Sequence, residues 1–175
     1  LAHLQNRSYG AKKLCSILHS VNTSSGQTVG HQTPAVLWGR PYIYEQLLGL
    51  TFQISAHSFF QTNTQGAESL YQKVIEWANL TGQEVVYDLY CGTGTIGILL
   101  AQQGAKQVYG LEEISEAVED AHKNASRNHL HHCDFQVGKV EKQLPVLLQQ
   151  QPADLVIVDP PRGGLHSHVV KLLNE

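Results

Sequence analysis

The stretch from Val85 to Gly97 constrains the fold of this chain more than any other part, because it combines a strand, a glycine turn and a helix start. Residues 85–90 are mostly apolar, with β-branched and aromatic side chains typical of a strand covered on both faces. Gly92 and Gly94 follow, and they allow backbone angles and a close ligand approach that a Cβ atom would block. A strand that leads through such a turn into a helix N-terminus predicts a nucleotide-type pocket at the carboxyl end of the strand.

The glycine spacing is compatible with two nucleotide cofactors, NAD and S-adenosylmethionine. Gly92-x-Gly94-x-x-Gly97 matches the dinucleotide-binding pattern. Glu112 follows at about the distance expected for an acid that binds ribose hydroxyls. The same geometry serves S-adenosylmethionine (SAM), and Asp88 favours it, because a carboxylate repels a pyrophosphate but attracts the ammonium and sulfonium of SAM. We therefore expect SAM rather than NAD, with a purely structural turn as the third reading.

Strands and helices alternate along most of the chain. The pattern predicts strands over 85–90, 107–112, 134–137 and 153–158, with helices between them. This alternation indicates an α/β fold with a parallel, Rossmann-like sheet, in which ligand residues gather at the carboxyl ends of the strands. Upstream, short strands are expected over 14–21, 36–38, 42–44 and 50–54, with a turn over 39–41 and a loop over 22–30.

A further helix is expected before the strand over 85–90, with Asn63 or Thr64 as its N-terminal cap. Its apolar residues at helical spacing predict the buried face, which comprises Ala67, Leu70, Val74, Trp77 and Ala78. Just before the cap, Phe59 and Phe60 are interpreted as core residues. Gln61 is a stronger functional candidate, since its amide can make several directed hydrogen bonds.

The composition is that of an ordinary globular chain. Its 175 residues are 42% hydrophobic and 15% charged, enough for one core and a small appendage. No apolar run reaches membrane-spanning length, so we expect no membrane partner. Three widely spaced cysteines indicate reduced thiols in a cytoplasmic protein. Cys133 adjoins three histidines, but this short turn lacks the spaced ligand pairs of zinc sites, and we expect no metal.

The chain is predicted to have two parts. Residues 1–49 carry four Lys or Arg and one acid, whereas the whole chain has a net charge of −3. This basic, strand-rich segment suits a polyanionic partner, although a few solvated surface charges would give the same count. Residues 50–175 would form the SAM-binding domain. Because the chain contains no methionine, we expect a fragment of a longer protein that lacks the last strands of this domain.

Four motifs, in this order, resemble those of a known enzyme family: Ser-Phe-Phe-Gln-Thr-Asn over 58–63, Asp-Leu-Tyr-Cys-Gly-Thr-Gly over 88–94, Val-Tyr-Gly-Leu-Glu over 108–112, and Asp-Pro-Pro-Arg from Asp159. An acid followed by two prolines forms a rigid rim beside a cofactor. Arg162, where related enzymes that modify base nitrogens have an aromatic residue, is informative. Over about residues 30–175 the chain resembles the RNA uracil-C5 methyltransferase family.

The resemblance implies a role for each motif. Gln61 would contact SAM, Tyr90 and the Gly92–Thr95 loop would line its methionine part, and Glu112 would hold the ribose. Asp159 would lie between the cofactor and the target base. Together with the residue-based reasoning, the cofactor-binding candidates are Gln61, Asp88, Tyr90, Gly92, Gly94, Thr95, Glu112 and Asp159. The chain departs from the family pattern at Lys139, Gly163 and His129.

The resemblance also implies a reaction, the transfer of a methyl group from SAM to C5 of a uridine in rRNA or tRNA. In the family a cysteine thiolate adds to C6 and makes C5 nucleophilic, and a base later removes the C5 proton. That cysteine lies in a Ser-Cys-Asn-Pro segment, which does not occur in these 175 residues. We therefore expect no catalytic residue here, apart from Asp159 as a candidate that positions the base, and we expect the chain alone to be inactive.

Other functions stay open at this point. A methyltransferase for an exocyclic base nitrogen also uses Asp-Pro-Pro, although Arg162 and the 58–63 motif argue against it. A non-catalytic SAM- or RNA-binding domain and an NAD-dependent oxidoreductase are the alternatives from other classes. The RNA and the uridine are not determined by the sequence, and neither is the oligomeric state, for which we expect a monomer.

Overall fold

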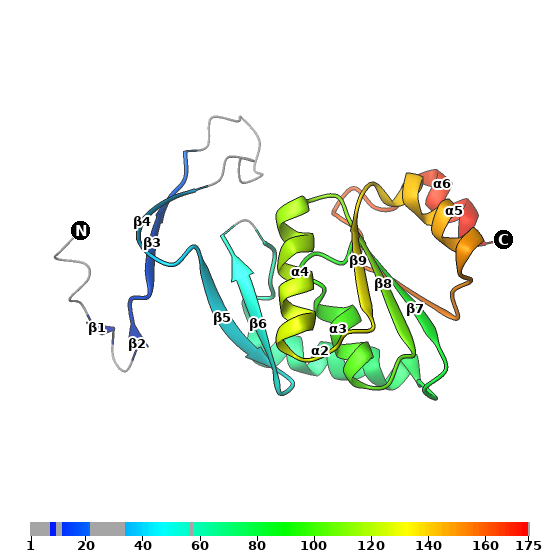
Figure 1. Ribbon diagram of the computed structural model, residues 1–175, viewed down its shortest axis with the longest axis horizontal. Helices are drawn as coiled ribbons and strands as arrows, with labels where there is room; N and C mark the ends of the chain where they lie inside the picture. The colour runs from blue at the N-terminus through cyan, green and yellow to red at the C-terminus, as the bar shows by residue number, and fades with distance from the viewer. Residues whose placement is uncertain (1–7, 10–11, 22–33, 57, 175) are drawn as a thin grey trace.

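The computed structural model describes residues 8–9, 12–21, 34–56 and 58–174 (Figure 1). The loop predicted over 22–30 lies outside these residues. The N-terminal part contains β1 (Ser8–Tyr9), β2 (Lys12–Lys13), β3 (Ser16–His19), β4 (Ala35–Gly39), β5 (Tyr42–Leu47) and β6 (Leu50–Ser55). Helix α2 (Thr64–Ala78) follows. The remaining elements are β7 (Val85–Leu89), α3 (Thr95–Gln102), β8 (Gln107–Glu112), α4 (Ser115–Arg127), β9 (Cys133–Val137), α5 (Val140–Gln150), β10 (Leu155–Val158) and α6 (Ser167–Leu172).

The central sheet has the strand order β10-β7-β8-β9, and all of its pairings are parallel. The predicted parallel α/β sheet is therefore confirmed. Because the strands are parallel, their carboxyl ends lie along one edge, and the connections that leave this edge can meet around a ligand. The connection after β7 is the glycine loop, and the one after β10 begins with Asp159.

Strand β7 is covered on both faces, as its apolar sequence predicts. Val85, Tyr87 and Leu89 pack in one cluster with side chains of α5 and α6. Val86, which points to the other face, packs with Leu100 of α3. Figure 1 shows α5 and α6 on the opposite side of the sheet from α3 and α4, so the domain has three layers.

Helix α2 begins at the predicted cap, but its buried face agrees with the prediction only in part. The Asn63 side chain accepts a hydrogen bond from the Gly66 backbone N–H over 3.0 Å, which confirms the cap. Two residues of the predicted buried face are exposed, Leu70 by 53% and Trp77 by 81%. Ala67 and Ala78 pack against the core as predicted, but their packing neighbours on the helix are Tyr71 and Ile75. The stripe is still helical in spacing, but Tyr71 supplies its largest side chain.

Three antiparallel strand pairs, β1–β2, β3–β4 and β5–β6, lie upstream of α2. In the last of them, Leu47 pairs with Leu50, so the boundary predicted between residues 49 and 50 falls in its turn. Strand β6 also contacts α4, which packs on strands β8 and β9 of the central sheet (Figure 1). The division into parts at this position stays a prediction. Among the described residues, no helix is both long and apolar enough to cross a membrane.

Candidate functional site

Two adjoining hollows open where β7, β8 and β10 end. The larger has a volume of about 660 Å³, within the usual range for small-molecule sites, and the smaller about 50 Å³. Both are lined by Phe59, Gln61, Tyr90, Gly92 and Asp159. The smaller also has Asp88 and Thr95 in its wall, and the larger has Glu112 and Lys139. The fold thus brings seven of the eight predicted cofactor residues together from four separate segments.

The eighth candidate, Gly94, lies outside both linings and is a glycine for another reason. Its φ is +77°, and a Cβ atom there would lie 2.8 Å from Phe135 Cζ and 3.0 Å from Ala121 Cβ. At Gly92 (φ +53°), by contrast, a Cβ would meet nothing within 4 Å. The structure therefore separates the two glycines, because Gly94 allows the loop to pack on β9 and α4, whereas Gly92 leaves open space at the hollow wall.

Asp88 is buried at the end of β7, with 1% of its surface exposed. Its Oδ2 accepts a hydrogen bond from the Gly97 backbone N–H in the first turn of α3, over 2.8 Å. Burial raises the pKa of Asp88 to about 7, and the nearby carboxylates of Asp159 and Glu112 act in the same direction, against this hydrogen bond. Three acids, of which Asp88 is buried, line the two adjoining hollows and favour a ligand that carries positive charge.

Glu112 joins the loops that follow β7 and β8. Its Oε2 accepts a hydrogen bond from the Gly92 backbone N–H over 3.1 Å, and its Oε1 accepts one from Ile114 N–H over 2.9 Å. Each carboxylate oxygen can accept a second hydrogen bond, so the oriented side chain still has acceptor sites for the hydroxyls of a ribose. This geometry is compatible with the predicted role of Glu112.

Tyr90 turns the chain from β7 into the glycine loop with a φ of +63°. Positive φ is rare for an aromatic residue, and such strained positions cluster at ligand sites. Tyr90 lies in the wall of both hollows. The sequence motif identified Tyr90 as a candidate, but the left-handed backbone is a finding of the structure.

Two aromatic residues of the site differ from the expectations: Phe59 was predicted as a core residue, and Tyr71 was not predicted at all. Phe60 packs on Phe52 with ring centroids 5.9 Å apart, as predicted for a core residue, but Phe59 is 72% exposed and lines both hollows. Tyr71 of α2 lines the smaller hollow, and burial raises its pKa to about 12. Its spacing of four residues from Ala67 and Ile75 was the available signal.

Comparisons with known proteins agree with this geometry. A model of the methyltransferase domain family matches residues 80–171. A protein of Enterococcus faecalis named as an uncharacterized RNA methyltransferase is 46% identical over 165 residues, which make up 93% of this chain and 36% of that protein. Another, from Caldanaerobacter subterraneus subsp. tengcongensis, is 43% identical over 166 residues. The chain spans about a third of the length of these curated relatives.

A solved structure supports the same grouping. The tRNA (uracil-54, C5)-methyltransferase of Pyrococcus abyssi, crystallised with S-adenosyl-L-homocysteine, is 35% identical with a TM-score of 0.74. The match covers 93% of this chain and 39% of that one. It confirms the predicted fold, that of class I SAM-dependent methyltransferases, and the resemblance drawn from the four motifs. Since the family model covers more than half of its length, the chain belongs to the methyltransferase domain family, and its relatives are named RNA methyltransferases.

Proposed function

We propose that this chain is the SAM-binding part of an RNA (uracil-C5) methyltransferase. The observation that carries the proposal is the convergence of Gln61, Asp88, Tyr90, Glu112 and Asp159 on adjoining hollows at the carboxyl edge of a parallel sheet. The 35% identical neighbour crystallised with S-adenosyl-L-homocysteine supports SAM as the ligand and a uracil in RNA as the substrate.

In this proposal the residues orient the cofactor and the base. SAM, when bound, supplies the methyl group as an electrophile. Glu112 accepts hydrogen bonds from the ribose hydroxyls, while Asp88 and Asp159 favour the cationic methionine part. Asp159 follows β10, precedes two prolines and lines both hollows, and in this proposal it also positions the target base beside the cofactor.

The described cysteines of the sheet are poor candidates for the nucleophile that adds to C6. Burial raises the pKa of Cys91 well above its usual value. Burial also raises the pKa of Cys133, to about 12, so both thiols stay protonated near neutral pH. Cys15 is exposed but lines neither hollow. We therefore propose that the nucleophile is supplied from outside these 175 residues.

Calorimetric titration of the chain with SAM, and separately with NADH, tests the cofactor. We expect SAM to bind and NADH not to bind. Glu112→Ala should weaken SAM binding at least about tenfold, because the variant loses a charged acceptor for the ribose and the link to Gly92. Glu119→Ala is the matched control, since Glu119 is an exposed acid paired with Lys123 on α4 and lies outside both linings.

Three results would contradict the proposal, in whole or in part. NADH binding would overturn the cofactor assignment and with it the family function. Equal SAM affinity in Glu112→Ala and Glu119→Ala would remove Glu112 from the site. If the chain transferred a methyl group to RNA by itself, the proposal of an external nucleophile would be wrong.

A further inference from the structure

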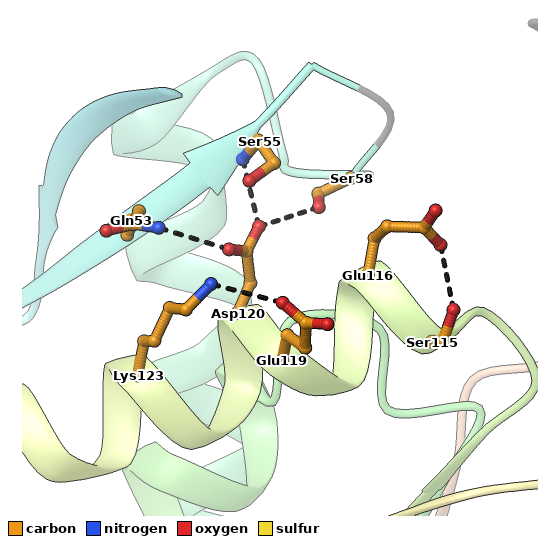
Figure 2. A network of polar contacts seen from close by, with 8 residues as sticks. All are labelled: Gln53, Ser55, Ser58, Ser115, Glu116, Glu119, Asp120 and Lys123. Atoms are coloured by element: carbon orange, nitrogen blue, oxygen red, sulfur yellow. Dashed lines mark hydrogen bonds and ion pairs between the residues drawn. The ribbon is translucent and has the colours of Figure 1, made fainter. Parts of the chain in front are cut away.

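A buried carboxylate on α4 lies outside the hollows and still holds one of their walls. Asp120 is 1% exposed and points from α4 toward β6 (Figure 2). Its Oδ2 accepts hydrogen bonds from the Ser58 hydroxyl over 2.9 Å and from the Ser55 backbone N–H over 3.0 Å. Its Oδ1 accepts one from Gln53 Nε2 over 3.2 Å. Three donors thus converge on a single carboxylate.

Asp120 is the first of three side chains, four residues apart, that bind the edge of β6. Asn124 accepts from the Gln53 backbone N–H over 2.6 Å and donates to the Gln53 carbonyl over 3.1 Å. Asn128 bonds the N–H and the carbonyl of Thr51 in the same way, each over 3.0 Å. Four helical residues rise about 6 Å and two strand residues about 6.7 Å, so the two repeats match. We call Asp120, Asn124 and Asn128 the α4 ladder.

The α4 ladder reaches the hollows at two points. Asn124 also donates to the carbonyl of Thr93 in the glycine loop, over 3.3 Å. Asp120 reaches beyond the end of β6 to Ser58, and the next three residues include Phe59 and Gln61, which line both hollows. One helix therefore holds two walls of the same site, the glycine loop and the segment that carries Gln61.

We propose that Asp120 is a positioning residue for Gln61, which it places against the glycine loop through its bond to the Ser58 hydroxyl. The inference rests on the proposed SAM site. Binding the edge of β6 requires only the Ser55 contact, whereas the bond to Ser58 orients the segment after the strand. In Asp120→Asn an NH₂ group would face at least one of the three donors, so the variant should impair the same function.

The affinity for SAM, measured by calorimetry well below the melting temperature, tests this role. Ser58→Ala removes the hydroxyl and leaves the α4 ladder intact, and we expect it to raise the Kd for SAM at least about fivefold. Ser58→Thr retains the hydroxyl and should restore an affinity near that of the wild type. Asn128→Ala is the matched control, because it removes a ladder contact far from Gln61 and should lower stability without changing the Kd.

A double-mutant cycle tests whether Ser58 acts through Gln61. If it does, Ser58→Ala should have little further effect on the Kd in a Gln61→Ala background. Two results would overturn the positioning role: a full effect of Ser58→Ala in the Gln61→Ala background, or a Kd for Ser58→Ala within about twofold of the wild type. In either case, SAM binding by the wild type would still uphold the proposed site. No SAM binding by the wild-type chain would overturn both.

Discussion

At the scale of single residues, Asp88 shows how burial and a hydrogen bond oppose each other. The Gly97 N–H favours its charged form, while burial disfavours that form more strongly, and the pKa rises from the ordinary 3.8 to about 7. Between pH 3.8 and about 7, Asp88 therefore keeps its proton in the folded protein but has lost it in the unfolded chain. Asp88 thus lowers stability progressively as the pH rises through this window.

Asp88→Asn should remove this pH dependence. We expect the stability advantage of Asp88→Asn over the wild type, as the difference in free energy of unfolding, to increase as the pH rises from about 5 toward 7. The increase should be up to about 1.4 kcal/mol per pH unit and should level off above this range. Urea denaturation of both proteins over this range measures the difference, in which the contributions of the histidines cancel. A difference that does not change with pH would contradict the raised pKa.

The two loop glycines make a second prediction at this scale. Gly92→Ala should cost only about 1 kcal/mol of stability, from the positive φ, but should weaken SAM binding at least about tenfold because the methyl group enters the open hollow. Gly94→Ala adds a clash with Phe135 and should cost more than about 2 kcal/mol. Urea denaturation and calorimetry distinguish the two variants, and the reverse pattern would refute the separate roles.

At the scale of elements, α4 replaces a third strand beside the β5–β6 hairpin. The edge of β6 would otherwise expose unpaired backbone groups, and α4 ladder side chains satisfy those of Thr51, Gln53 and Ser55. This arrangement joins the β5–β6 hairpin to α4 through side chains rather than through backbone pairing.

Asn124→Ala should therefore destabilise the fold strongly. Asn124 is fully buried, and its loss leaves the Gln53 N–H and the carbonyls of Gln53 and Thr93 without this partner. We expect a loss of about 2–4 kcal/mol in the free energy of unfolding by urea. Lys123→Ala, an exposed neighbour paired with Glu119, is the control and should change stability by less than about 0.5 kcal/mol. Similar losses in both variants would contradict the role of the ladder.

At the scale of the whole molecule, the site links segments that are far apart in the chain. Its lining residues include members of the segments 59–61, 88–96 and 112–114, and Asp159 after β10. A ligand that contacts all of them binds only the folded chain, so its binding energy adds to the free energy of unfolding.

SAM at about 100 times its Kd should stabilise the chain by about 2.7 kcal/mol, or roughly 5–10 °C in melting temperature. Differential scanning calorimetry with and without SAM measures this shift. Gly92→Ala at the same SAM concentration should show a much smaller one. A wild-type melting temperature that SAM leaves unchanged would contradict a site built from these segments.

Local patterns determined much of this protein. The strand β8 has the predicted bounds, Gln107–Glu112, and the Asn63 cap and the parallel sheet were predicted as well. These features could be predicted because hydrophobic periodicity, glycines and helix caps act over a few residues and can be recognised in the sequence. Six of the seven predicted residues that the fold brings together lie in the four motifs, and the seventh, Thr95, directly follows the second motif.

Tertiary structure decided what depends on contacts between distant residues. Helical spacing allowed either Tyr71 or Leu70 on the buried face of α2, and the packing of the helix selected Tyr71. Nothing local showed that Gly94 serves packing while Gly92 faces open space. The α4 ladder was missed because its partners lie more than sixty residues away, on β6. Side-chain identity sets which contacts are available, but only the packing of α4 against the hairpin selects those that form.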